Sequence, residues 1–212
     1  MESFSGAIIN RYNELSREDC CLSCGNALSH ARVLPGHVCV DLGSGKGHDV
    51  LRMALLTGDK GQVFGIDLSE GMMEAAMENA RRLQITHIDF IRSPLEKLLL
   101  DNDMADVVIS NCTINHSLDQ EAVWREIARI LKPGGHFSVS DIYALEAVPA
   151  EFASDPGAVS ECWAGAVTKE RYLQNILNAG FVELEMMEES QPYQKGQIQV
   201  ASFTIRGKKQ KK

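Results

Sequence analysis

The chain has 212 residues, a formal net charge of −8 and a pI near 5.3. This length suits one domain with a sizeable core, and the acidic balance argues against nucleic acid as the main substrate, since nucleic-acid-binding proteins usually carry a basic face. No run of apolar residues approaches the ~20 that cross a membrane. The N-terminus lacks the basic and apolar blocks of a signal peptide, so we expect a cytoplasmic protein whose six cysteines are reduced thiols.

Segments with strand character alternate along the chain with segments of helical periodicity. We expect strands at 38–42, 62–67, 88–92, 105–111 and 136–142, and helices at 46–56, 70–83, 119–131 and 169–178. Ser69 and Thr168 are placed to cap two of these helices, and the Lys-Pro-Gly-Gly run at 132–135 should end a third. This alternation predicts an α/β fold with a doubly wound, mostly parallel sheet.

The C-terminal part departs from this alternation. Residues 143–167 are irregular, and we expect them to form an insertion on the substrate side of the domain. Two further strands, at 182–187 and 198–206, flank a short connection, which predicts a terminal antiparallel hairpin. We therefore expect a single domain over residues 1–212 with a seven-stranded sheet, in which residues 1–36 form an N-terminal cap or lid.

A glycine-rich loop follows the first predicted strand. Residues 41–47 read Asp-Leu-Gly-Ser-Gly-Lys-Gly, and the second strand ends at Asp67, about twenty residues later. Glycine lets the backbone turn sharply and approach a ligand, and an acid at the tip of the next strand can bind both hydroxyls of a ribose. The combination predicts a site for an adenosine-containing cofactor at the carboxyl ends of the parallel strands.

The glycine spacing separates the candidate cofactors. The dinucleotide fingerprint is G-x-G-x-x-G, whereas this loop reads G-x-G-x-G, and Lys46 followed by Gly47 does not fit a P-loop. Asp41 would repel a pyrophosphate, but it suits a ligand with an amino group and a positive sulfonium. The pattern resembles motif I of the class I S-adenosylmethionine-dependent methyltransferases, with a nicotinamide enzyme or a simple glycine turn as alternatives. The resemblance implies S-adenosyl-L-methionine as the cofactor.

The same resemblance implies which residues hold this cofactor. Leu95 and Glu96 follow the third strand, where class I enzymes surround the adenine, although Glu96 could instead belong to a solvated face. Met72 lies on the second helix, where family members place a residue near the adenosine. The full set of expected cofactor-binding residues is Asp41, Gly43, Ser44, Gly45, Gly47, Asp67, Leu68, Met72, Leu95, Glu96 and Asn111.

Three cysteine-containing segments narrow the family further. They are Leu22-Ser-Cys-Gly-Asn26 before the first strand, Val108-Ile-Ser-Asn-Cys-Thr-Ile-Asn115 after the fourth, and Glu161-Cys-Trp-Ala-Gly-Ala166 in the irregular stretch. Together with Leu-Lys-Pro-Gly-Gly at 131–135 and Ser-Asp-Ile at 140–142, they resemble the arsenite methyltransferases of microbes and animals. The resemblance extends from about residue 20 to about residue 206.

This resemblance implies that Cys24, Cys112 and Cys162 form the catalytic site and bind trivalent arsenic, presented as arsenite or a thiol adduct. The chemistry agrees, because a soft metalloid prefers thiolates and three sulfurs leave its lone pair free to attack a methyl group without a general base. Catalysis then consists mainly of alignment, which can be worth roughly 7–11 kcal/mol. A thiol reductant such as glutathione or thioredoxin is the implied partner.

Several alternatives remain open. The cysteines could line the pocket of a methyltransferase for a small organic molecule, or belong to a metalloid-binding or redox-sensing protein that does not turn the cofactor over. Cys21 and Cys24 have zinc spacing, although the sequence offers no matching second pair. Longer family members carry a further upstream cysteine linked to thiol exchange, a role for which Cys20 or Cys21 is a candidate. We expect Cys39 to be a buried core residue and His116 to be a pocket-wall or capping residue.

Overall fold

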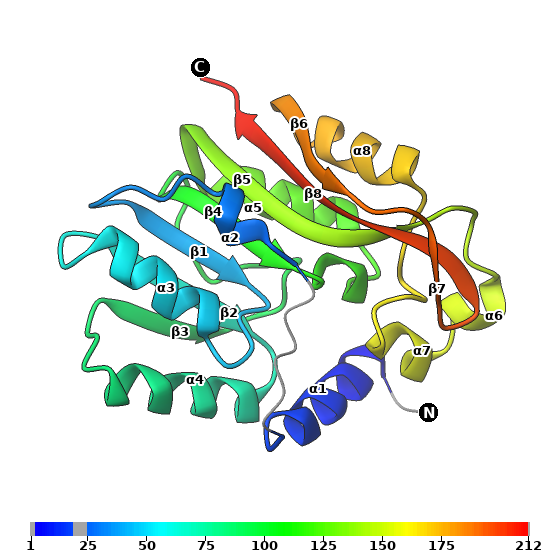
Figure 1. The fold of residues 1–212 in the computed structure, drawn as a ribbon, viewed down its shortest axis with the longest axis horizontal. Coiled ribbons are helices and arrows are strands. Elements are labelled where there is room, and N and C mark those ends of the chain that lie inside the picture. Colours follow the sequence, from blue (N-terminus) through cyan, green and yellow to red (C-terminus); the bar gives the residue numbers. More distant parts are fainter. Residues whose placement is uncertain (1–2, 19–24, 212) are drawn as a thin grey trace.

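The structure is a computed structural model that describes residues 3–18 and 25–211 (Figure 1). Cys20, Cys21 and Cys24 lie outside the described residues, and so does the zinc alternative at Cys21 and Cys24.

One mixed sheet forms the centre of the molecule. Its strands follow the order β3-β2-β1-β4-β5-β8-β6, and a short strand, β7, pairs with β8 beside this path. The first five strands pair in parallel, whereas β8 is antiparallel to both β5 and β6. The strands are β1 (Val38–Leu42), β2 (Gln62–Asp67), β3 (Ile88–Arg92), β4 (Ala105–Asn111), β5 (Leu131–Ala144), β6 (Phe181–Glu189), β7 (Tyr193–Lys195) and β8 (Ile198–Lys209). The predicted doubly wound α/β fold with a terminal antiparallel hairpin is confirmed, but β7 adds an eighth strand to the seven that were expected.

The strand bounds match the prediction for β1 to β4 and differ at β5. This strand begins at Leu131, directly after the preceding helix, rather than at His136. Leu131 pairs with Ala105, the register then shifts, and His136 pairs with Val107. The Pro-Gly-Gly run therefore ends the helix as expected, but it continues as an irregular extended segment at the start of the strand.

Helices cover the sheet and its carboxyl end (Figure 1). Those expected from the sequence are α3 (His48–Thr57), α4 (Glu70–Arg82), α5 (Gln120–Ile130) and α8 (Lys169–Asn178). The Ser69 hydroxyl accepts from Met72 N–H at 3.2 Å and the Thr168 hydroxyl from Arg171 N–H at 3.4 Å, so both predicted caps are present. In the described part of the chain, no helix combines the length and apolar character needed to cross a bilayer.

Short helices and an N-terminal helix were not expected. They are α1 (Phe4–Leu15), α2 (Ala27–His30), the 3-10 turn η1 (Ile114–His116), α6 (Ala150–Ala153) and α7 (Pro156–Ser160). The segment 143–167 is thus irregular only in part. Helix α1 packs against α7 and α4, so it lies across the carboxyl end of the sheet (Figure 1).

Alternation along the strands divides the core between the two faces of the sheet. On β1, Cys39 packs with the helices α2 and α3, whereas Val40 and Leu42 face the cluster built around Trp124 of α5. The Trp124 ring makes edge contacts with Phe137, Tyr172 and Phe181, at centroid distances of 4.9, 5.8 and 5.9 Å. Both faces are therefore covered, which holds the carboxyl ends of the strands in fixed positions.

Candidate functional site

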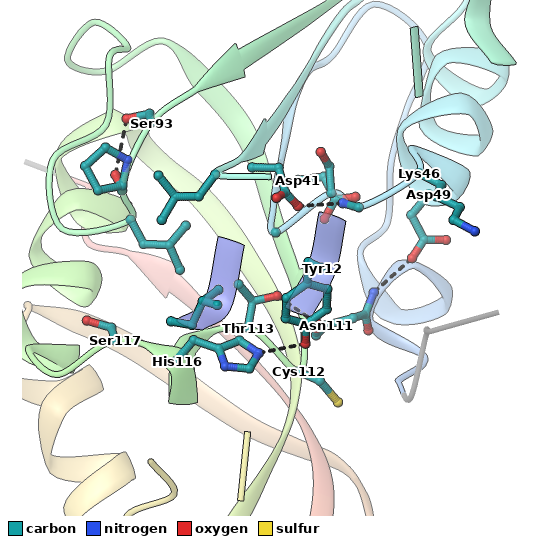
Figure 2. A pocket seen from close by; sticks show the side chains of 18 of the residues that line it. Tyr12, Asp41, Lys46, Asp49, Ser93, Asn111, Cys112, Thr113, His116 and Ser117 are labelled. Carbon is teal, nitrogen blue, oxygen red and sulfur yellow. Dashed lines mark hydrogen bonds between the residues drawn. The ribbon is translucent and has the colours of Figure 1, made fainter. Parts of the chain in front are cut away.

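A cavity lies at the carboxyl ends of β1 and β4 (Figure 2). From β1 the chain continues to β2 and β3 on one side, and then crosses to β4 and β5 on the other. Ligands of doubly wound sheets bind at such a reversal of strand order. The wall is formed by the loops after β1 and β2, the segment 93–96 after β3, the segment 111–117 after β4, and one side of α1.

The predicted cofactor-binding residues all line this cavity except Gly47 and Met72. Gly47 precedes α3 with φ +78°, and a Cβ there would lie 3.0 Å from the Cβ of Ala76, so this glycine allows close packing between helices. The side chain of Met72 is buried, on the same stripe of α4 as Ala76 and Ala80. The spacing of this stripe indicates a core face, and the structure does not bring Met72 to the cavity.

Asp67 organises the glycine-rich loop. Its carboxylate accepts from Gly45 N–H at 2.9 Å and from Ser69 N–H at 2.8 Å. Gly43 and Gly45 have φ values of +71° and +51°, in the region that favours glycine. Burial raises the pKa of Asp67, and the hydrogen bonds from Ser69 and Gly45 oppose this shift. Asp67, at the end of β2, therefore has two roles: it holds the glycine-rich loop in place, and it lines the cavity.

Two further carboxylates, Asp41 and Asp49, lie on either side of this loop in the sequence and line the same cavity. Asp41 is buried and lines the cavity, and burial, followed by the charges of Asp49 and Asp67, raises its pKa well above the ordinary value. Asp49 accepts from Asn111 Nδ2 at 2.9 Å and from Arg52 Nη1 at 2.9 Å. Because buried carboxylates are stabilised by an opposite charge, this end of the cavity favours a cationic ligand group.

Tyr12 of α1 and His116 of η1 form one wall of the cavity (Figure 2). His116 Nδ1 lies 3.1 Å from Val159 O, and its Nε2 lies 2.9 Å from the Tyr12 hydroxyl. A carbonyl only accepts, so Nδ1 carries the proton and Nε2 accepts from Tyr12. Burial lowers the pKa of His116 to about 4. His116 is thus a neutral wall residue that ties α1 to α7, in line with the sequence analysis.

Two of the three predicted arsenic ligands lie next to each other. Cys112 follows β4, lines the cavity and donates its N–H to Ser140 O at 2.8 Å. Cys162 is 4% exposed, and its Sγ lies 3.4 Å from Cys112 O and 3.9 Å from Asp141 Oδ1. Cys162 does not itself line the cavity. Both cysteines have positive φ, +51° and +74°, a strained conformation that often marks functional sites.

Cys24 lies outside the described residues, but the residue after it is placed. A Cβ on Gly25 would lie 2.4 Å from both Asn111 Oδ1 and Ser140 Cβ, so the backbone there is in close contact with the ends of β4 and β5. Ala27 N–H donates to Asn111 Oδ1 at 3.2 Å. The segment that leads away from Cys24 therefore passes the same strand ends that carry Cys112.

Cys39 is fully buried in β1, as expected, and burial raises the pKa of its thiol to about 12. Within residues 3–18 and 25–211, no group of three or more His, Cys, Asp and Glu side chains is arranged to hold a metal ion.

The residues that sequence reasoning missed come mainly from α1. Ser5, Ile8 and Tyr12 line the cavity from this helix, and Asn13 Oδ1 accepts from the Ser69 hydroxyl at 2.7 Å. A signal was present, because Ser3 is a good N-cap and Phe4, Ile8, Tyr12 and Leu15 recur at helical spacing.

Comparisons with known proteins agree with this geometry. Residues 34–180 match the sequence profile of a family described as "Methyltransferase domain". An arsenite methyltransferase of Halobacterium salinarum is 32% identical over 165 residues, which are 78% of this chain and 42% of that protein. The arsenite methyltransferase of Mus musculus is 35% identical over 157 residues, which are 70% of this chain and 40% of that protein. The chain thus spans less than half the length of these two relatives.

A solved structure extends the likeness to the fold. The crystal structure of an arsenic(III) S-adenosylmethionine methyltransferase from Chlamydomonas reinhardtii superimposes with a TM-score of 0.73 at 27% identity. The match covers 97% of this chain and 73% of that chain.

Proposed function

This chain belongs to the family described as "Methyltransferase domain", and we propose that it is an arsenite methyltransferase, which transfers a methyl group from S-adenosylmethionine to trivalent arsenic. The observation that carries the proposal is the position of Cys112 and Cys162. They lie 50 residues apart in sequence, yet the Cys162 thiol contacts the Cys112 carbonyl at the end of β4, beside the cavity.

The cavity residues fit S-adenosylmethionine. Asp67 lies at the tip of β2, where we assign it to the ribose hydroxyls, and Leu68, Leu95 and Glu96 are assigned to the adenine. The acidic end at Asp41 suits the amino group and the sulfonium. An added Cβ on Gly45 would meet no atom within 4 Å, so this glycine faces open space that a ligand can occupy. When bound, the cofactor supplies an electrophilic methyl group.

The thiols are assigned to the acceptor. Thiolates of Cys112 and Cys162, with Cys24 as the third, would hold arsenic as three sulfur ligands and leave its lone pair free. S-adenosylmethionine, held at the glycine-rich loop and Asp67, would supply the methyl group to this lone pair, and its sulfur would keep the electron pair of the broken carbon–sulfur bond. No proton leaves the acceptor in this step, so the protein's contribution is alignment, supplied by residues at the fixed ends of β1, β2 and β4.

The partner side of the proposal follows from the same chemistry. A thiol reductant such as glutathione or thioredoxin would present arsenic as a thiol adduct and keep the cysteines reduced. We place the reaction in the cytoplasm, a reducing compartment in which cysteines persist as thiols. We assign residues 1–212 to one domain. In this domain we assign the N-terminal cap (residues 1–36) and the insertion (residues 143–167) to a cover over the site, an assignment supported by the contact between α1 and α7.

The proposal is tested by incubating the protein with arsenite, glutathione and labelled S-adenosylmethionine. Transfer of label to arsenic is the expected result. Tight, thiol-dependent arsenite binding without transfer would instead favour a metalloid-binding or redox-sensing protein. Absence of arsenite binding would favour a small organic acceptor.

His116→Ala is expected to retain most of its turnover. Both ring nitrogens are engaged, by Tyr12 and by Val159, and lone-pair attack needs no base. A true general base would be worth about 10²–10⁴-fold, so a loss of that size with cofactor binding intact would support an organic acceptor.

The same variant is expected to show a distinct pH dependence of stability. The pKa of His116 falls to about 4 in the folded protein, below its ordinary 6.5. Between these values the unfolded chain binds more protons, so the stability due to neutral His116 is complete above pH 6.5 and is lost as the pH falls towards 4. The difference in melting temperature between wild type and His116→Ala should therefore shrink from pH 7.5 to pH 5. A constant difference would contradict the assigned burial.

A further inference from the structure

Cys162 has a backbone conformation that only its surroundings can maintain. Its φ is +74°, and its N–H donates to Val159 O at 2.9 Å, where α7 ends. A non-glycine residue in this region is strained and persists only where neighbouring contacts hold it. The residues that follow, 163–166, make two contacts with the rest of the protein. Each contact involves a glycine, Gly196 or Gly165, at which there is no room for a Cβ atom.

The first contact joins Trp163 to the hairpin between β7 and β8. A Cβ on Gly196 would lie 2.3, 2.5 and 2.6 Å from three atoms of the indole ring. Trp163 is 5% exposed, its Nε1 donates to Glu161 Oε2 at 3.0 Å, and its ring makes an edge contact with Phe152 at a centroid distance of 5.3 Å. The ring therefore has little freedom to move away from Gly196. Figure 1 shows β7 beside α6 and α7, the helices that precede this tryptophan.

The second contact joins Gly165 to the 3-10 turn after β4. A Cβ on Gly165 would lie 1.8 Å from Asn115 O. Gln120 Nε2 donates to Gly165 O at 2.9 Å and to Asn115 Oδ1 at 3.1 Å. Asn115 Nδ2 in turn donates at 2.8 Å to Asp141 Oδ1, the oxygen that lies 3.9 Å from the Cys162 thiol. The segment is thus held on two sides, by the hairpin and by the strand ends.

Resting on the proposed function, we propose that Trp163, Gly165 and Gly196 are positioning residues that hold the Cys162 thiol beside Cys112 before arsenic binds. Holding a ligand group in place beforehand removes part of the ordering cost of binding. The hairpin of β7 and β8, none of whose residues lines the cavity, becomes a determinant of arsenic affinity through the indole ring.

Gly196→Ala tests this proposal, with Gly180→Ala as the matched control. Both glycines have positive φ, +57° and +86°, but a Cβ at Gly180 meets no atom within 4 Å. For Gly196→Ala we expect kcat/KM for arsenite to fall about 10- to 100-fold, the scale of a 1 Å displacement, while S-adenosylmethionine affinity stays unchanged. Gly180→Ala should keep both values.

A second readout does not depend on arsenic. Iodoacetamide should alkylate Cys162 faster in Gly196→Ala than in wild type or in Gly180→Ala, as followed by peptide mass spectrometry, whereas Cys112 should react at an unchanged rate. Trp163→Leu should reproduce both effects, and the double variant with Gly196→Ala should be no worse than the poorer single one, because both changes act through one contact.

The outcomes separate this inference from the proposed function. Wild-type protein that neither binds nor methylates arsenite contradicts the function, whatever the alkylation rates are. Wild-type protein that methylates arsenite, with Gly196→Ala equal to it in kcat/KM and in Cys162 alkylation, overturns the positioning role.

Discussion

Cys112→Ser and Cys162→Ser are each expected to reduce arsenite methylation to near background, a loss of at least about 10²-fold, because a soft sulfur ligand is replaced by a hard hydroxyl. Cys24→Ser is expected to behave alike. S-adenosylmethionine affinity should stay close to wild type, since the cavity wall keeps its shape. Methyl transfer, arsenite affinity and melting temperature of each variant measure the effect.

Non-additivity and a control make this result diagnostic. If the cysteines act as one unit, the double variant Cys112→Ser/Cys162→Ser should be little worse than either single one. Cys39→Ser is the matched control, because Cys39 is fully buried and does not line the cavity. A hydroxyl in that core should cost about 1–3 kcal/mol of stability and leave turnover per folded molecule unchanged. Wild-type turnover in both Cys112→Ser and Cys162→Ser would end the arsenic assignment.

Substitutions in the glycine-rich loop are expected to weaken the cofactor instead. Asp67→Ala should reduce S-adenosylmethionine affinity by about 1.5–3 kcal/mol, the usual worth of a charged hydrogen bond. The carboxylate also accepts from the N–H groups of Gly45 and Ser69. Because Asp67→Asn keeps one acceptor oxygen, its cofactor affinity should lie between those of the wild type and Asp67→Ala. Calorimetry with the cofactor and its demethylated product measures these affinities.

Gly45→Val should be more damaging than Asp67→Ala. Gly45 has φ +51°, which a β-branched residue adopts poorly, and its Cβ would enter open cavity space. Gly180→Val carries a comparable backbone strain at φ +86°, also in open space but at the end of α8, so it separates instability from lost binding. Wild-type cofactor affinity in both Asp67→Ala and Gly45→Val would remove the cofactor assignment.

Local patterns predicted the parts of the fold that local physics controls. The strands β1 to β4 have the predicted bounds, and Ser69 and Thr168 cap their helices. Hydrophobic periodicity and capping depend on residues a few positions apart, so they are legible in the chain itself. The short helices in segment 143–167 escaped prediction because four or five residues give too little periodicity.

The sequence by itself determined the sheet, the glycine-rich loop at its carboxyl end and the acid that faces it, since parallel strands bring their ends to one edge. Only the tertiary structure decided that Cys162 lies against Cys112 and that α1 forms a cavity wall. These placements depend on packing between segments tens to more than a hundred residues apart. Such contacts depend on how the whole core packs, so they cannot be predicted from a local sequence pattern.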